Sequence, residues 1–130
     1  MDPIRILTIV TIAMFAVLAA ITVFISIQKR TMFAKLGQLL EDGRYDEFFR
    51  LIDSRIARLV YPDYNRSYFK LNAHMIKGDW KEAEKLLDDL LARKVSDEQR
   101  ADLVIKAFNI YISLSRGKKA KRMLDEIERL

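Results

Sequence analysis

The sequence contains no cysteine, which excludes disulfide bonds, a catalytic thiolate and cysteine-ligated zinc sites. It also lacks a glycine-rich phosphate loop and the glycine-flanked serine of a nucleophile elbow. Acidic pairs such as Asp88 and Asp89 are sequence neighbours whose side chains diverge on a helix, so they make poor metal clamps. We therefore expect a protein that is not an enzyme and that uses no cofactor and no metal ion.

Charge and proline are both absent from residues 6–27, a run dominated by aliphatic side chains. As a helix this run spans roughly 33 Å, close to the hydrocarbon core of a bilayer at about 30 Å. Its threonine and serine hydroxyls can donate hydrogen bonds to carbonyl groups one turn earlier, which makes them compatible with lipid. The run predicts a transmembrane anchor within residues 1–30 of a single-pass membrane protein.

A cleavable signal peptide is the alternative, with Arg5 as its basic start and residues 16–20 as a small-residue cleavage region. The apolar run continues well beyond these alanines, which favours the anchor. Orientation follows from the flanking charges, because Arg5 precedes the run whereas Lys29, Arg30 and Lys35 follow it. The positive-inside rule then predicts an outer N-terminus and a cytoplasmic helical domain.

Residues 31–130 are enough for one domain, and their apolar side chains recur at helical spacing with no run that reads as a strand. The pattern predicts an all-α fold with helices over residues 32–40, 48–59, 64–77, 80–95, 97–115 and 118–129. Gly43 and Gly78 are expected to end two of these helices. Ser96 and Gln99 predict a capping box at the start of another.

One eleven-residue motif occurs three times, as GRYDEFFRLID at residues 43–53, GDWKEAEKLLD at 78–88 and SRGKKAKRMLD at 115–125. The copies begin 35 and then 37 residues apart, and a period in the mid-thirties made of two helices is typical of helical solenoids. The second copy presents a glycine, an acidic residue, an aromatic and an alanine in the order that joins the two helices of a tetratricopeptide repeat. These are Gly78, Asp79, Trp80 and Ala83. The chain therefore resembles the tetratricopeptide repeat family.

The resemblance implies an antiparallel helix-pair solenoid of about three repeats, over residues 31–60, 64–95 and 97–130, behind the anchor of residues 1–30. The first motif has Phe48 in place of the alanine, and the third has Ser115 and Gly117 in place of the glycine and the aromatic. A six-helix bundle with similar turns is the alternative. The single histidine, His74, falls where the family packs a large residue, which implies a partly buried structural side chain.

In this family the first helices of the repeats line a concave surface that receives a peptide or a partner helix, often through an asparagine. Asn72 and Asn109 correspond to that position, and one amide can both donate and accept hydrogen bonds from a peptide main chain. The resemblance implies that Asn65, Tyr68 and Ile105 face the same way. Two exposed asparagines placed by chance are the alternative.

A basic cluster occupies the third motif and consists of Arg116, Lys118, Lys119, Lys121 and Arg122. A solvated helix face explains it most simply, and contact with anionic lipid is the next interpretation because the anchor holds the domain near a membrane. Nucleic acid is not expected as a partner, since no aromatic residues are interleaved with these charges.

These features predict a membrane-tethered adaptor or scaffold that binds a protein or peptide partner, itself membrane-associated, and localises it at the membrane. One alternative is an accessory subunit of a translocation or envelope-assembly complex, with the helical domain on the outer side. Another is a structural subunit packed permanently into a larger membrane complex.

Overall fold

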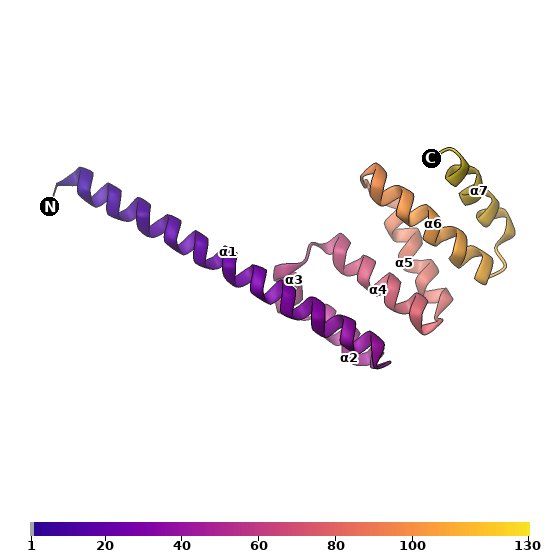
Figure 1. The fold of residues 1–130 in the computed structure, drawn as a ribbon. Coiled ribbons are helices and arrows are strands. Elements are labelled where there is room, and N and C mark those ends of the chain that lie inside the picture. The colour runs from indigo at the N-terminus through magenta and orange to yellow at the C-terminus, as the bar shows by residue number, and fades with distance from the viewer. Residues whose placement is uncertain (1) are drawn as a thin grey trace.

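The structure, a computed structural model, describes residues 2–130, which form seven helices and no strand (Figure 1). The predicted all-α fold is confirmed. The helices are α1 (Pro3–Glu41), α2 (Tyr45–Ile52), α3 (Arg55–Val60), α4 (Asp63–Lys77), α5 (Trp80–Ala92), α6 (Asp97–Ser113) and α7 (Gly117–Glu128).

Helix α1 combines the apolar run and the expected helix over residues 32–40 in one element of 39 residues, about 58 Å long. The predicted boundary between residues 30 and 31 lies inside it, because Gln28, Lys29 and Arg30 are good helix formers with no glycine or proline among them. The apolar part of α1 is long and apolar enough to cross a membrane, with a mean hydropathy of 2.7, and no part of that stretch is buried. It extends away from the other helices in Figure 1.

The threonine hydroxyls within the apolar run are paired as expected. Thr8, Thr11 and Thr22 donate to the carbonyls of the residues four positions earlier at 2.8 to 2.9 Å. At the start of the helix, the Asp2 side chain accepts a hydrogen bond from the Ile4 N–H at 3.2 Å. These three threonine hydroxyls therefore find their acceptors within the helix itself, which makes them compatible with lipid.

The turns that precede α2, α5 and α7 share one backbone conformation. Each begins with a left-handed residue, with φ of 70° at Gly43, 82° at Gly78 and 58° at Ser115. In each turn the N–H of the next residue donates to the carbonyl five positions earlier at 2.7 to 2.9 Å, the pattern of a Schellman ending. The sixth residue of each motif is buried: Phe48, Ala83 and Ala120.

The prediction of a single helix over residues 48–59 is wrong. The chain instead forms α2 and α3, with a break at Asp53 and Ser54. The Ser54 hydroxyl accepts a hydrogen bond from the Ala57 N–H at 3.3 Å and so caps α3. The helix expected over residues 80–95 ends earlier, at Ala92. The capping box of Ser96 and Gln99 is confirmed, with hydrogen bonds of 3.0 and 3.1 Å.

The helices pack in chain order, as Figure 1 shows. Helices α2 and α3 lie along the C-terminal part of α1, α2 contacts α4, and each later helix contacts the next. Helix α4 contributes Ala73 to the buried cluster shared with α1, α2 and α3, and Leu71 to the cluster shared with α5, α6 and α7. Because α4 is buried on two sides, it joins the two halves of the domain.

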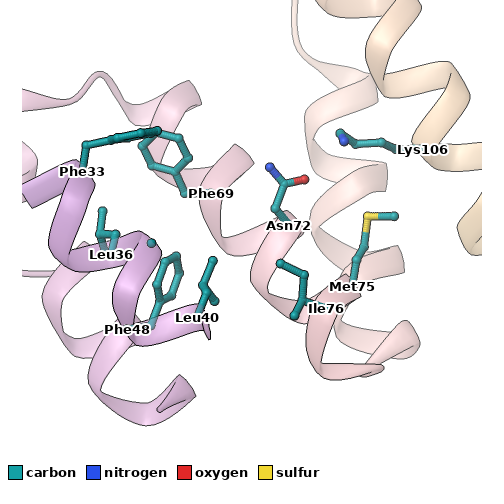
Figure 2. A pocket seen from close by; sticks show the side chains of 10 residues that line it. Phe33, Leu36, Leu40, Phe48, Phe69, Asn72, Met75, Ile76 and Lys106 are labelled. Atoms are coloured by element: carbon teal, nitrogen blue, oxygen red, sulfur yellow. The ribbon is translucent and has the colours of Figure 1, made fainter. Parts of the chain in front are cut away.

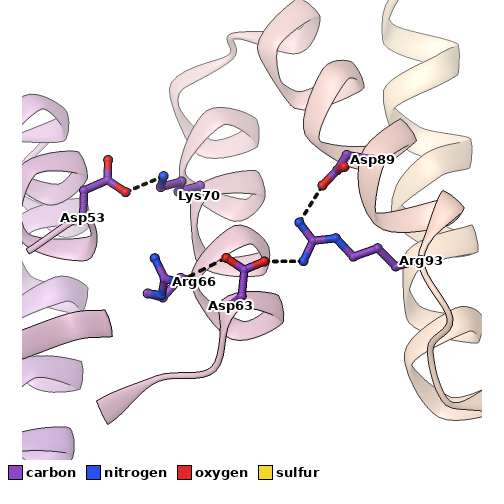
Figure 3. Close-up of polar contacts among 6 residues, drawn as sticks. All are labelled: Asp53, Asp63, Arg66, Lys70, Asp89 and Arg93. Atoms are coloured by element: carbon purple, nitrogen blue, oxygen red, sulfur yellow. Dashed lines mark hydrogen bonds and ion pairs between the residues drawn. The ribbon is translucent and has the colours of Figure 1, made fainter. Parts of the chain in front are cut away.

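Surface ion pairs connect α4 to its neighbours on both sides (Figure 3). Lys70 pairs with Asp53, the residue that follows α2. Asp63 lies 2.7 Å from Arg93, which also pairs with Asp89 of α5 at 2.7 Å. Exposed pairs of this kind contribute little free energy, about 0 to 1 kcal/mol each, but they agree with the packing order of the helices.

Candidate functional site

A groove of about 560 Å³ lies between α1, α4 and α6, and Figure 2 shows its side chains. Its volume falls within the range of about 300 to 1,000 Å³ that is common for ligand sites. The lining is mostly apolar and consists of Phe33, Leu36, Gly37, Leu40, Phe48, Phe69, Asn72, Met75, Ile76 and Lys106.

The apolar rim of the groove is accessible to solvent. Phe33 of α1 lies near Phe69 of α4, with ring centroids 6.2 Å apart and planes tilted by 58°. Phe33 is 62 % exposed and Ile76, also on the rim, is 59 % exposed. Phe48, by contrast, is buried and forms part of the floor. Large apolar side chains exposed around an apolar hollow are typical of surfaces that bind another molecule.

Two polar side chains complete the groove. Asn72 lies on α4, between Phe69 and Ile76, as Figure 2 shows. Lys106 enters from α6, and its Nζ lies 5.3 Å from the centre of the Tyr68 ring, in a cation–π contact. Within residues 2–130, Lys106 forms no ion pair. The groove therefore combines an apolar surface with one amide and one positively charged side chain that forms no ion pair in the described part of the chain.

Tyr68 connects α4 to α6 because its hydroxyl donates a hydrogen bond to the Asp102 carboxylate. Burial raises the pKa of Tyr68 well above its usual value, and the Asp102 carboxylate adds to the effect, so the phenol stays neutral. Tyr64 stacks on Tyr68 with centroids 6.0 Å apart. These two rings line a separate shallow hollow of about 240 Å³ with Glu98, Gln99 and Asp102.

The five predicted contact residues are therefore in different settings. Asn72 lines the groove, and Tyr68 lies between the groove-lining Lys106 and the second hollow. Ile105 and Asn109 are exposed on α6, and Asn65 is half-buried on α4. Neither Asn65, Ile105 nor Asn109 is among the residues that line the groove.

Sequence reasoning missed the wall that α1 contributes. Phe33, Leu36 and Leu40 form an apolar stripe in the helix that the sequence predicts over residues 32–40, and Leu36 is buried. Phe33 instead faces the groove, where it meets Phe69. The available signal was the size of the stripe, which presents more apolar surface than α2 and α3 cover.

No family model, curated protein or solved structure matches this chain. The resemblance to tetratricopeptide repeats therefore depends on the three motifs alone.

The basic cluster on α7 is divided by its contacts. Arg116 and Lys119 approach Glu84 of α5 at 3.4 and 3.8 Å, and the Lys119 Nζ lies 5.3 Å from the centre of the Tyr111 ring. The other three members are exposed and form no ion pair in the described part of the chain: Lys118, Lys121 and Arg122. Helix α7 lies at the opposite end of the row of helices from the apolar part of α1 (Figure 1).

His74 is half-buried, as expected, and stacks on Phe49 with ring centroids 4.6 Å apart. Burial lowers the pKa of His74, although the Asp79 carboxylate, 3.8 Å from Nδ1, acts in the opposite direction. The ring is therefore held mainly in its neutral form, where it packs between α2 and α4.

Proposed function

We propose that this chain is a single-pass membrane adaptor that binds an apolar segment of a partner protein in the groove between α1, α4 and α6. The composition of the groove carries the proposal. Covering Phe33 and Ile76 gains about 25 cal/mol for each Å² of apolar surface removed from water. Asn72 can pair with a main-chain amide of the partner, and Lys106 can pair with an acidic side chain beside the apolar segment. The role requires no reaction, cofactor or metal ion.

We further propose that the domain is a helix-pair solenoid similar to tetratricopeptide repeats. Three observations support this arrangement. The three motifs share one turn conformation, each buries its sixth residue, and the helices pack in chain order. The pairs are the C-terminal part of α1 with α2, α4 with α5, and α6 with α7. The groove then lies on the side formed by the first helix of each pair.

The partner segment is expected to lie close to the bilayer. Phe33 follows Ile27, the last residue of the apolar run, by six residues, which is roughly 9 Å along a helix. We therefore expect a partner that binds this close to the bilayer surface to be membrane-associated itself. Confinement to the same surface raises its effective concentration to about the millimolar range, so a modest intrinsic affinity is enough.

Site-specific photo-crosslinking in native membranes tests the groove. A photoreactive amino acid is placed at Ile76, which is 59 % exposed on the rim, or at Ile112, which is 56 % exposed on α6 and does not line the groove. We expect a discrete crosslinked protein from position 76, weakened by Asn72→Ala, and none from position 112. Equal crosslinking at both positions, or none at 76, would contradict the proposal.

Protease treatment of sealed vesicles tests the orientation. We propose an outer N-terminus and a cytoplasmic helical domain, because Lys29, Arg30 and Lys35 follow the apolar run. In right-side-out vesicles the helical domain should be cleaved only after the membrane is opened. Cleavage in intact vesicles would favour the accessory subunit with its domain on the outer side.

A further inference from the structure

Helix α3 is held against α1 where the apolar run ends. The Tyr61 hydroxyl, directly after α3, donates a hydrogen bond to the Lys29 carbonyl at 2.9 Å. The Lys29 Nζ lies 5.9 Å from the centre of the Tyr61 ring. Ile25, which belongs to the apolar run, packs against the buried cluster that contains Ala57 and Tyr61. The domain therefore reaches the last turn of the apolar run and does not stand off from it.

The outer face of α3 is apolar. Ala57 and Val60 are buried in the cluster shared with α1, whereas Ile56 and Leu59 are exposed. The spacing of three residues places Ile56 and Leu59 on the same side of the helix, and Leu59 is 64 % exposed. Within residues 2–130, no other helix buries either of these two side chains.

A small pocket lies where the end of α3 meets α1. It has a volume of about 240 Å³ and is lined by Lys29, Arg30, Phe33 and Tyr61. Aromatic rings and basic side chains in this combination are typical of the membrane–water interface, where rings lie at headgroup level and basic groups meet lipid phosphates.

We propose that α3 and this pocket form a second membrane-contact site, in which Ile56 and Leu59 enter the bilayer interface and nearby basic side chains bind anionic lipid headgroups. The inference rests on the anchoring that is part of the proposed function. The basic side chains are Lys29, Arg30, Arg55 and Arg58.

Two observations identify the bilayer as the occupant of this face. Helix α1 is unbroken between the apolar run and Lys29, so α3 is held at the level of the headgroups and cannot be lifted away without breaking its contacts with α1. The four basic side chains form no ion pair within residues 2–130, and their charge complements the negative cytoplasmic leaflet.

The second contact has a consequence for the groove. A single spanning helix leaves the domain free to rotate about the axis of α1. Contact through α3 on one side of α1 restricts that rotation, so the groove opens in one direction relative to the membrane plane. Phe33 lines both the pocket and the groove and therefore links the two sites.

Fluorescence quenching on the full chain in vesicles tests the site. Because the chain has no cysteine, Leu59→Cys, Val17→Cys and Leu124→Cys each accept one environment-sensitive fluorophore. Val17 lies in the apolar run and reports insertion of the anchor. Leu124, 40 % exposed on α7, is the matched leucine outside the site. The vesicles contain phosphatidylcholine and phosphatidylserine, with brominated acyl chains as the quencher.

We expect quenching and a blue-shifted emission at positions 17 and 59, and neither at position 124. If the fluorophore at position 17 is quenched but those at positions 59 and 124 are not, the lipid contact of α3 is overturned and the anchor stands. No quenching at 17 overturns the anchor and the contact together. A blue shift at 59 without quenching means that protein, such as a second copy of the chain, covers α3, and it also overturns the proposal.

The charge requirement is tested by Arg55→Gln with Arg58→Gln, compared with Lys118→Gln and Lys121→Gln on α7. All four side chains are exposed, so neither pair disturbs the core. We expect the α3 pair to reduce quenching at position 59 in vesicles with phosphatidylserine to the level seen in phosphatidylcholine alone. An effect of the α7 pair alone would assign anionic lipid to the basic cluster and overturn the site on α3.

Discussion

The Tyr111 hydroxyl on α6 donates a hydrogen bond to the Asp88 carboxylate on α5 at 2.9 Å. Asp88 is the last residue of the second motif, and Asp53, the last residue of the first, pairs with Lys70 on α4. In both motifs the final aspartate thus reaches the next long helix of the chain. Asp125 ends the third motif on α7.

Tyr111→Phe should lower the free energy of unfolding by about 0.5 to 1.5 kcal/mol, since it removes one hydrogen bond while the exposed Asp88 remains hydrated. Tyr45→Phe is the control, because within residues 2–130 the tyrosine hydroxyls that form hydrogen bonds are those of Tyr61, Tyr68 and Tyr111. Urea titration of the detergent-solubilised chain measures both. Equal losses for the two variants would show that the Asp88 contact is not stabilising.

Ser115→Gly should raise the free energy of unfolding by about 1 kcal/mol. Ser115 has a φ of 58°, a left-handed conformation that costs an L-residue roughly 1 to 2 kcal/mol, and Gly43 and Gly78 occupy the same place in the other turns. Ser113→Gly is the matched control and should destabilise, because Ser113 is helical and its hydroxyl donates to the Asn109 carbonyl at 2.9 Å. A change of the same sign in both variants would contradict the shared turn conformation.

Ala83→Leu should lower the free energy of unfolding by about 1 to 3 kcal/mol through overpacking, because Ala83 is fully buried where α5 meets its neighbours. Ala92→Leu, at the exposed end of the same helix, should be nearly neutral. Thermal denaturation followed by circular dichroism compares the two. If Ala83→Leu melts at the same temperature as the unchanged chain, the space between α4 and α5 can hold a larger side chain, and the close packing of Ala83 is contradicted.

His74 predicts a specific dependence of stability on pH. Burial lowers the pKa of His74 in the folded chain below its ordinary value of 6.5, so the unfolded chain binds the proton more readily. Stability from the neutral ring is therefore fully present above about pH 6.5 and is lost as the pH falls below that value. His74→Gln should abolish this dependence, and since His74 is the only histidine, an unchanged profile would contradict the assignment.

The turns and caps were predictable because they depend on a few adjacent residues. Gly43 and Gly78 end helices as expected, and Ser96 with Gln99 forms the expected capping box. The break at Ser54 was missed because the apolar periodicity continues across it, although a serine after an aspartate is a local signal for a new helix start.

The groove could not be predicted in the same way. It depends on the approach of Phe33 and Phe69, which are 36 residues apart in the sequence, and on Lys106 from a third helix. No local pattern specifies that approach. The resemblance to tetratricopeptide repeats assigned Asn72 and Asn109 to equivalent positions, whereas only Asn72 lines the groove.

Asn72→Ala should weaken partner binding by about 1 to 3 kcal/mol, the cost of one lost hydrogen bond in a desolvated groove. Asn109→Ala changes an exposed side chain of α6. It tests whether the partner extends along that helix, as the resemblance to tetratricopeptide repeats implies. Neither change should alter the melting temperature, because neither side chain is part of the core. Recovery of the photo-crosslinked partner provides the measurement.

The opposite result would assign partner binding to the basic cluster. In that case recovery of the crosslinked partner is complete in both asparagine variants and is lost when Lys118, Lys121 and Arg122 are neutralised. These three residues are exposed, so their neutralisation should leave folding intact. That outcome would favour a partner recognised by charge and would leave the groove without a role in binding.

Helix α1 runs from Pro3 to Glu41 without a break, so the apolar run and one wall of the groove belong to the same rigid element. A spanning helix tilts when its hydrophobic length exceeds the thickness of the surrounding bilayer. Any such tilt swings Phe33 and Leu40 through the same angle, because no hinge intervenes. In the proposed adaptor, the thickness of the surrounding bilayer would therefore set the angle at which a partner approaches the groove.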